Sequence, residues 1–218
     1  MNAASLAEIA RQLLSPVEAP ASWVHSQLLS PEEPESDDVD EWVTLDVDVA
    51  RRLAAAGERI VLRWPALTLH EAPKLQGISF EAIVQGATGV ELDESLRALG
   101  VALARGTAVR AALASGDTGI DCYRAAAATR RNLGTAVPIR ARWDGPLDVK
   151  GAALALTFGA DEIAGPMAPP KQRYKLAQLG GPPEDGGRPS PTFVESLIQA
   201  AGRFPARRGA SVTRGDQR

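Results

Sequence analysis

The chain has 218 residues, 44% of them apolar, which is enough to bury one sizeable hydrophobic core. Its net charge of −3 argues against a general nucleic-acid binder, which usually carries a basic surplus. A single cysteine, Cys122, excludes an internal disulfide and fits a reducing compartment. Neither a membrane span nor a secretory signal is recognisable, so we expect a cytoplasmic protein.

Residues 1–43 are predicted to be an appendage to the main domain. An amphipathic helix is expected from Ser5 to Leu14, followed by a proline-rich, acidic linker that ends at Glu41. Carboxylates in this run could hold a hard cation, but the spacing and the central glycine of a calcium loop are missing. We therefore predict no metal site.

Residues 44–206 are predicted to form one α/β domain. A helix capped by Thr44 or Asp46 should run to about Ala56, and strands should follow at 60–64 and 77–85. Helical patterns follow at 92–103, at 107–114 and at 120–133. Alternation of strands and helices favours a parallel sheet with helical cover.

The stretch from Val137 to Met167 gives the clearest pattern. Apolar residues alternate along 137–143 with Pro138, Arg140 and Arg142, which predicts a strand with one buried face. An apolar helix should run from Asp148 to Gly159, and a short strand should follow at 161–165.

The carboxyl-terminal part ends in one more predicted helix. Thr192 and Glu195 have the spacing of a capping box ahead of an apolar series, and Gly202 should end the helix. Residues 207–218 are rich in arginine and glycine without an apolar period, which predicts a disordered tail.

Two motifs in this half resemble a known family. They are IRARW with VKGAALALTFGADEIAG at 139–165, and the series Thr192, Glu195, Leu197, Ile198, Ala201, Gly202, Arg203, Pro205 and Arg208. Both are similar to the end of the catalytic barrel in the radical S-adenosylmethionine enzymes of the futalosine route to menaquinone, such as aminofutalosine synthase. The resemblance covers about 117–208. It implies an α/β, partial TIM-barrel-like (β/α) sheet with helical cover.

The chain departs from that family in its cysteines. The family's chemistry needs an iron–sulfur cluster held by three closely spaced thiolates, and this chain has Cys122 alone. We therefore expect no iron–sulfur cluster and no radical reaction started by this chain by itself.

Candidate ligand-binding residues are few, and no catalytic residue can be named. Asp161 and Glu162 stand at a helix-to-strand junction, and the resemblance implies that they lie near the top of the barrel. Asp161 could instead accept structural hydrogen bonds from the backbone. Trp143 ends the preceding strand, and His70 with Glu71 could act as an acid–base pair or be an ordinary loop histidine. Motifs of serine hydrolases, zinc sites and phosphate loops are missing.

Three functional hypotheses remain. The favoured one is a cluster-less relative of the futalosine-pathway enzymes that acts as an accessory or binding subunit beside a catalytic homologue. The second is an enzyme that uses a barrel pocket for non-radical chemistry on a related small molecule, and the third is a remnant without function. An exposed apolar face would favour a partner, and a polar pocket would favour the enzyme.

Overall fold

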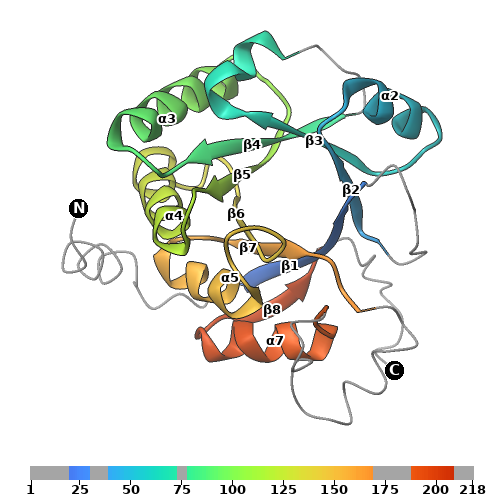
Figure 1. Ribbon diagram of the computed structural model, residues 1–218, viewed down its shortest axis with the longest axis vertical. Helices are drawn as coiled ribbons and strands as arrows, with labels where there is room; N and C mark the ends of the chain where they lie inside the picture. The colour runs from blue at the N-terminus through green and yellow to red at the C-terminus, as the bar shows by residue number, and fades with distance from the viewer. Residues whose placement is uncertain (1–19, 30–38, 73–77, 169–187, 209–218) are drawn as a thin grey trace, which may run out of the picture.

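The computed structural model describes residues 20–29, 39–72, 78–168 and 188–208 (Figure 1). In these ranges strands and helices alternate along the chain. The strands are β1 (Pro20–Leu28), β2 (Glu41–Thr44), β3 (Ile60–Pro65), β4 (Ser79–Gln85), β5 (Val109–Ser115), β6 (Ile139–Arg142), β7 (Glu162–Gly165) and β8 (Phe204–Arg207). The helices are α2 (Val47–Ala55), α3 (Gly89–Ala104), α4 (Gly119–Leu133), α5 (Val149–Ala155) and α7 (Pro191–Ala200), with 3-10 helices η1 (Ala66–Glu71) and η2 (Leu156–Phe158).

Strands β1 to β7 form a closed parallel barrel. Each of β2 to β6 pairs in parallel with the strand that follows it in the chain. The ring closes at β1, which pairs with β7 along 22–25 and with β2 along 26–28. Helices lie on the outside of the ring (Figure 1). The predicted α/β, TIM-barrel-like fold is confirmed.

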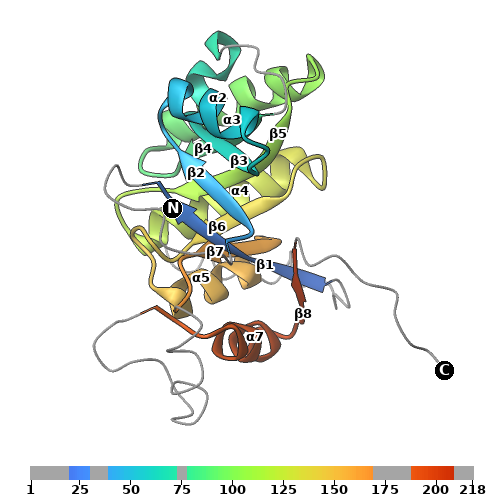
Figure 2. The same ribbon diagram turned by 90° about the vertical axis from the view of Figure 1, so that its right-hand side faces the viewer.

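Strands β8 and β2 both pair with the same edge of β1. The carbonyl of Trp23 accepts the Arg208 N–H at 3.0 Å, and the carbonyl of His25 accepts the Asp40 N–H at 2.8 Å. Carbonyls two residues apart in a strand point to the same side, so β8 and β2 lie end to end along β1. The Asp40 carboxylate fills the junction, where it accepts the His25 N–H at 2.9 Å and contacts Arg207 at 3.0 Å. Figure 2 shows β8 beside β1 and next to α7.

The main hydrophobic core lies between the barrel and its helices. Alternate residues of the strands point outward and pack under the helices, because successive side chains in a strand face opposite ways. These outward residues include Leu62, Phe80, Ala82, Val84, Ala112, Ala114, Ile139, Ala141 and Ile163. The other alternate set points into the barrel, and it is this set that carries the charges described below.

Two consecutive strand–helix units use the same turn. The sequences QGATG and SGDTG join β4 to α3 and β5 to α4, and in each the threonine accepts a backbone N–H of the first helical turn. Glycine is required because a Cβ at Gly86 would lie 2.1 Å from the Asp121 carbonyl oxygen, and one at Gly116 would lie 2.2 Å from the Asp121 side chain. Close packing of α4 on both turns therefore explains these glycines.

The structure corrects several local predictions. The predicted linker contains β1, so part of 1–43 belongs to the barrel, while the predicted helix at 5–14 lies outside the described residues. The alanine-rich stretch at 107–114 is strand β5 and not a helix, because a central barrel strand needs small residues under α4. Helix α7 is capped by Ser190, which accepts the Phe193 N–H at 3.3 Å, rather than by Thr192. Strand β8 includes Arg207, so the predicted tail at 207–218 begins one residue too early.

The most consequential correction concerns β6. Both of its faces are buried, and Arg140 and Arg142 are inside the barrel rather than on an open face.

Within the described part of the chain, no helix is long and apolar enough to cross a membrane.

Candidate functional site

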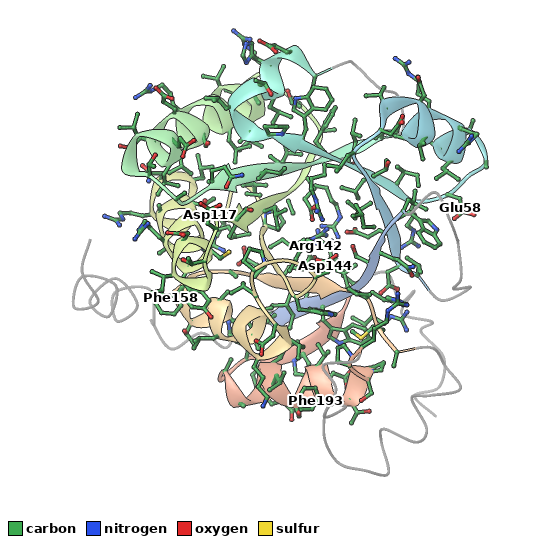
Figure 3. All side chains as sticks on the ribbon, viewed as in Figure 1. Glu58, Asp117, Arg142, Asp144, Phe158 and Phe193 are labelled. Carbon is green, nitrogen blue, oxygen red and sulfur yellow. The ribbon has the colours of Figure 1, made fainter. Side chains whose placement is uncertain are left out.

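The inside of the barrel holds a network of charged side chains, here called the barrel network. Its members come from six of the seven barrel strands and from the ends of β6 and β8. They are Glu41, Arg63, Glu81, Arg110, Arg140, Arg142, Asp144, Glu162 and Arg208. Figure 3, viewed as Figure 1, places Arg142 and Asp144 near the middle of the ring.

Arg140 lies at the centre of the barrel network. Its Nη1 donates to Glu81 at 2.9 Å and also contacts Glu41, and its Nε donates to Glu162 at 2.6 Å. Burial lowers the pKa of Arg140, but Glu162, Glu41 and Glu81 outweigh that effect and raise it well above its ordinary value. Arg140 is therefore a permanent cation fixed between three carboxylates.

A second layer lies toward the carboxyl ends of the strands. Arg142 donates to Asp144 through Nε at 2.8 Å and through Nη2 at 2.6 Å, and its Nη1 donates to the Ser26 hydroxyl at 2.6 Å. Arg63 donates to Glu81 at 2.7 Å. Burial raises the pKa of Glu81, but the opposing effect of Arg142, Arg140 and Arg63 is larger and brings it down to about 2. This carboxylate is ionised at neutral pH.

A third layer faces the amino ends of the strands. The β4–β5 register shifts between Phe80 and Glu81, where Arg110 is the extra residue of β5. Such a bulge re-aims a side chain, and here it sends Arg110 into the barrel, 3.3 Å from Glu41 and 3.4 Å from Glu162. Arg208, from the end of β8, donates to the same oxygen of Glu162 at 2.8 Å.

The charges of the barrel network nearly balance. Five arginines face four carboxylates, so one positive charge is in surplus, counted over the described residues. Buried charges are tolerated when each is paired and hydrogen-bonded. The network has the character of a fixed, ionised barrel filling rather than of an acid–base pair.

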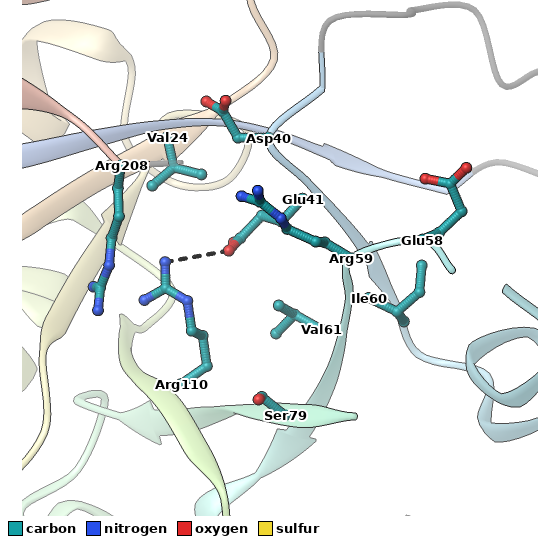
Figure 4. A pocket seen from close by; sticks show the side chains of 10 residues that line it. All are labelled: Val24, Asp40, Glu41, Glu58, Arg59, Ile60, Val61, Ser79, Arg110 and Arg208. Atoms are coloured by element: carbon teal, nitrogen blue, oxygen red, sulfur yellow. Dashed lines mark ion pairs between the residues drawn. The ribbon is translucent and has the colours of Figure 1, made fainter. Parts of the chain in front are cut away.

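A cavity opens at the amino ends of the strands, here called the amino mouth. Its volume is about 340 Å³, and its lining combines three arginines with acidic, hydroxyl and aliphatic groups (Figure 4). The lining residues are Val24, Asp40, Glu41, Glu58, Arg59, Ile60, Val61, Ser79, Arg110 and Arg208.

The structure does not bring the four predicted ligand-binding residues together. Trp143 lies at the carboxyl end of β6, where its indole N–H donates to the Pro166 carbonyl at 3.0 Å. His70 is exposed in η1, and its Nε2 lies 3.5 Å from Glu71, so the suggested pair is present but solvated.

The two predicted carboxylates lie at the opposite end from the one expected. Asp161 and Glu162 stand at the start of β7, so they belong to the amino end of the barrel and not to its top. Asp161 accepts the Ile139 N–H at 2.9 Å and contacts Arg130, which is the structural role considered for it. Glu162 is fully buried in the barrel network.

Sequence reasoning missed Arg140, Arg142, Glu41 and Glu81. A usable signal was present: in β4 and β6 the charged residues alternate with apolar ones, in strands that are flanked by helices on the outside. In a closed barrel the second face of a strand is also buried, so such charges must pair with one another.

The donor set of this chain does not fit an iron–sulfur cluster. The cluster needs thiolates, and Cys122 is the chain's one cysteine. It is 1% exposed in α4, and burial, followed by the charge of Asp121, raises its pKa to about 11. The described residues also hold no group of three or more His, Cys, Asp or Glu side chains placed to bind a metal ion.

Comparison with known proteins defines the class of fold. The sequence matches no protein-family model and no curated protein sequence. Among solved structures the chain is similar to HydG, a maturase of the [FeFe]-hydrogenase, with a TM-score of 0.52 and 8% identity over 94% of this chain and 69% of that chain. At this identity the likeness concerns the fold alone, and it supports a barrel fold shared by the two chains.

Proposed function

We propose that this chain is an accessory subunit built on a radical-S-adenosylmethionine-like barrel, without radical chemistry of its own. Its partner is a catalytic homologue, and the resemblance of its carboxyl-terminal motifs suggests an enzyme of the futalosine route to menaquinone. A cytoplasmic location is part of the same proposal. The lack of cluster ligands and the filling of the barrel by fixed ion pairs support a binding rather than a catalytic role.

The observation that carries the proposal is a series of exposed aliphatic side chains at the carboxyl ends of β1 to β5, here called the carboxyl rim. Leu28 ends β1, Leu45 and Leu67 follow β2 and β3, and Val90 and Ile120 open the helices after β4 and β5. They are 41%, 62%, 44%, 70% and 56% exposed. In barrels of this kind the carboxyl ends of the strands carry function.

Charges around the carboxyl rim indicate the chemistry of the partner. The exposed ionisable residues in the turns and first helical segments after β2 to β5 are mostly acidic, and they include Asp46, Asp48, Glu71, Glu91 and Asp117. Aliphatic anchors within an acidic border complement a partner surface with an apolar centre and a basic border.

A second candidate function is an enzyme that performs non-radical chemistry on a small molecule. The polar lining of the amino mouth favours it. In the described residues, however, the carboxylates of the barrel network are each paired with arginine, which leaves no evident general base there.

The test is complex formation between the purified chain and an aminofutalosine synthase from the same genome. Size-exclusion chromatography with light scattering should show a mixed complex. Leu45→Asp should abolish it, because a charge would be buried in the interface, whereas Val101→Asp should not, since Val101 is 42% exposed but lies on α3 away from the rim. Equal behaviour of the two variants, or the absence of any complex, would contradict the proposal.

A second measurement separates the accessory role from catalysis. After anaerobic reconstitution with iron and sulfide, the chain alone should give no stable cluster absorbance and should not cleave S-adenosylmethionine. Stoichiometric iron with reductive cleavage of the cofactor would refute the accessory role even if a complex forms.

A further inference from the structure

The amino mouth has the features of an anion site. Three arginines line it: in Figure 4 the Arg110 side chain points toward Glu41, Arg59 reaches in from the opposite side, and Arg208 lies beyond Arg110. They come from three separate parts of the chain, namely the turn before β3, the bulge of β5 and the end of β8.

The acidic groups of the same lining are largely neutralised. Glu41 is held by Arg140 and lies 3.3 Å from Arg110. Asp40 is held by Arg207 at 3.0 Å and by the His25 N–H at 2.9 Å. Glu58 is exposed at the outer edge of the cavity, so it competes weakly through solvent.

Arg110 is held more loosely than Arg140 in the barrel network. Its Nη2 lies 3.3 Å and 3.4 Å from two carboxylates, which is longer than the contacts of Arg140. Its Nη1 is buried and has no hydrogen-bond acceptor within the described residues. Burial lowers the pKa of Arg110, and although Glu162 and Glu41 oppose this effect, the net shift is downward. Arg110 therefore presents a guanidinium with an unused donor at the wall of this cavity.

Arg59 and Arg208 have donors to spare. Arg208 uses Nη1 on Glu162, and its side chain is 43% exposed. The Arg59 side chain is exposed and makes no ion pair within the described ranges. Planar guanidinium groups bind phosphate and carboxylate oxygens with paired hydrogen bonds.

We propose that the amino mouth binds the phosphate group of a small molecule, through Arg59, Arg110 and Arg208. A volume of about 340 Å³ exceeds what one phosphate needs, and Val24, Ile60 and Val61 provide an aliphatic wall for a small organic part. This inference does not depend on the accessory role, which concerns the opposite end of the barrel.

The test is titration of the intact chain with inorganic phosphate and with glycerol 3-phosphate, at constant ionic strength set by sodium chloride. Melting temperature and calorimetry should both show saturable binding. Tighter binding of the ester identifies an organic phosphate as the ligand, and equal affinity identifies free phosphate. Arg59→Met, which breaks no ion pair of the barrel network, should weaken binding by roughly tenfold.

Arg105→Met is the matched control. Arg105 is an exposed arginine at the same end of the barrel, where it caps α3 outside the cavity, and its loss should leave the affinity unchanged. The proposed site would be overturned if phosphate raised the melting temperature no more than sodium chloride does. Equal losses of phosphate affinity in Arg59→Met and Arg105→Met would also overturn it.

Discussion

Replacing Arg140 by methionine tests the charged barrel interior directly. Arg140 is fully buried, and its removal leaves Glu41, Glu81 and Glu162 inside the barrel with less compensating charge. Breaking a buried ion pair by removing one partner costs about 3–5 kcal/mol. Because domains are stable by about 5–15 kcal/mol in total, the variant should lose a large part of its stability in urea denaturation.

The pH dependence of the variant identifies the cause of that loss. Without Arg140 the pKa of buried Glu162 should rise above its value in the unfolded chain, because burial raises this pKa and Arg140 is the strongest of the charges that lower it. A group whose pKa is raised on folding stabilises the fold as the pH falls toward its unfolded value. The variant should therefore gain stability from pH 7.5 to pH 5.5, whereas the wild type should not. Equal slopes for the two proteins would refute the reasoning.

Two further variants serve as controls. Arg51→Met removes an exposed pair with Asp48, 3.2 Å long, which is worth at most about 1 kcal/mol. The double variant Arg140→Met, Glu41→Met removes one carboxylate with the cation, and it should be less destabilised than the two single losses added together. A loss for Arg140→Met no larger than that for Arg51→Met would show that the barrel interior is hydrated.

Three other measurements probe the rest of the fold. Leu156→Ala should lower the free energy of unfolding by about 2–5 kcal/mol, since this leucine is 4% exposed. Leu154→Ala, on the open face of α5, should lower it little, and equal losses of stability would show that the core lies elsewhere. Gly86→Ala should cost about 1–3 kcal/mol because its Cβ meets a backbone oxygen of α4, whereas Gly89→Ala meets open space, so similar melting temperatures would contradict that packing. The wild type should lose stability as the pH falls from about 4.5 to about 2, because over this range Glu81 is ionised in the folded state and protonated in the unfolded state. A melting temperature that stays constant over this range would contradict the pairing of Glu81 with arginine.

The sequence predicted the fold class well because most outward faces of the barrel follow simple periods. Ile78, Phe80, Ala82 and Val84 alternate along the strand predicted at 77–85, and all four lie in the core. The helix after Asp46 was also predicted with its cap, and Asp46 accepts two backbone N–H groups there.

The features that the sequence did not predict depend on closure of the barrel. Strand β1 is proline-flanked and follows no clear alternation, and it is a strand because β7, β2 and β8 supply its partners. Arg110 enters the barrel through a bulge, which the period of β5 does not show. The prediction that Asp161 and Glu162 lie at the top of the barrel is wrong, because residues that follow a helix and open the next strand of a parallel barrel lie at its amino end.

The pairing of β1 with β7 and β8 has a consequence for synthesis. Its partners are encoded more than a hundred residues later, and long-range parallel pairing is slow to form. At about 5–20 residues per second, on the order of ten seconds separate the emergence of β1 from that of β7. During that interval the barrel has not formed, so Trp23 and Val24, which are buried in the folded protein, remain exposed. The nascent amino-terminal strand is therefore a natural substrate for chaperones that bind extended apolar segments.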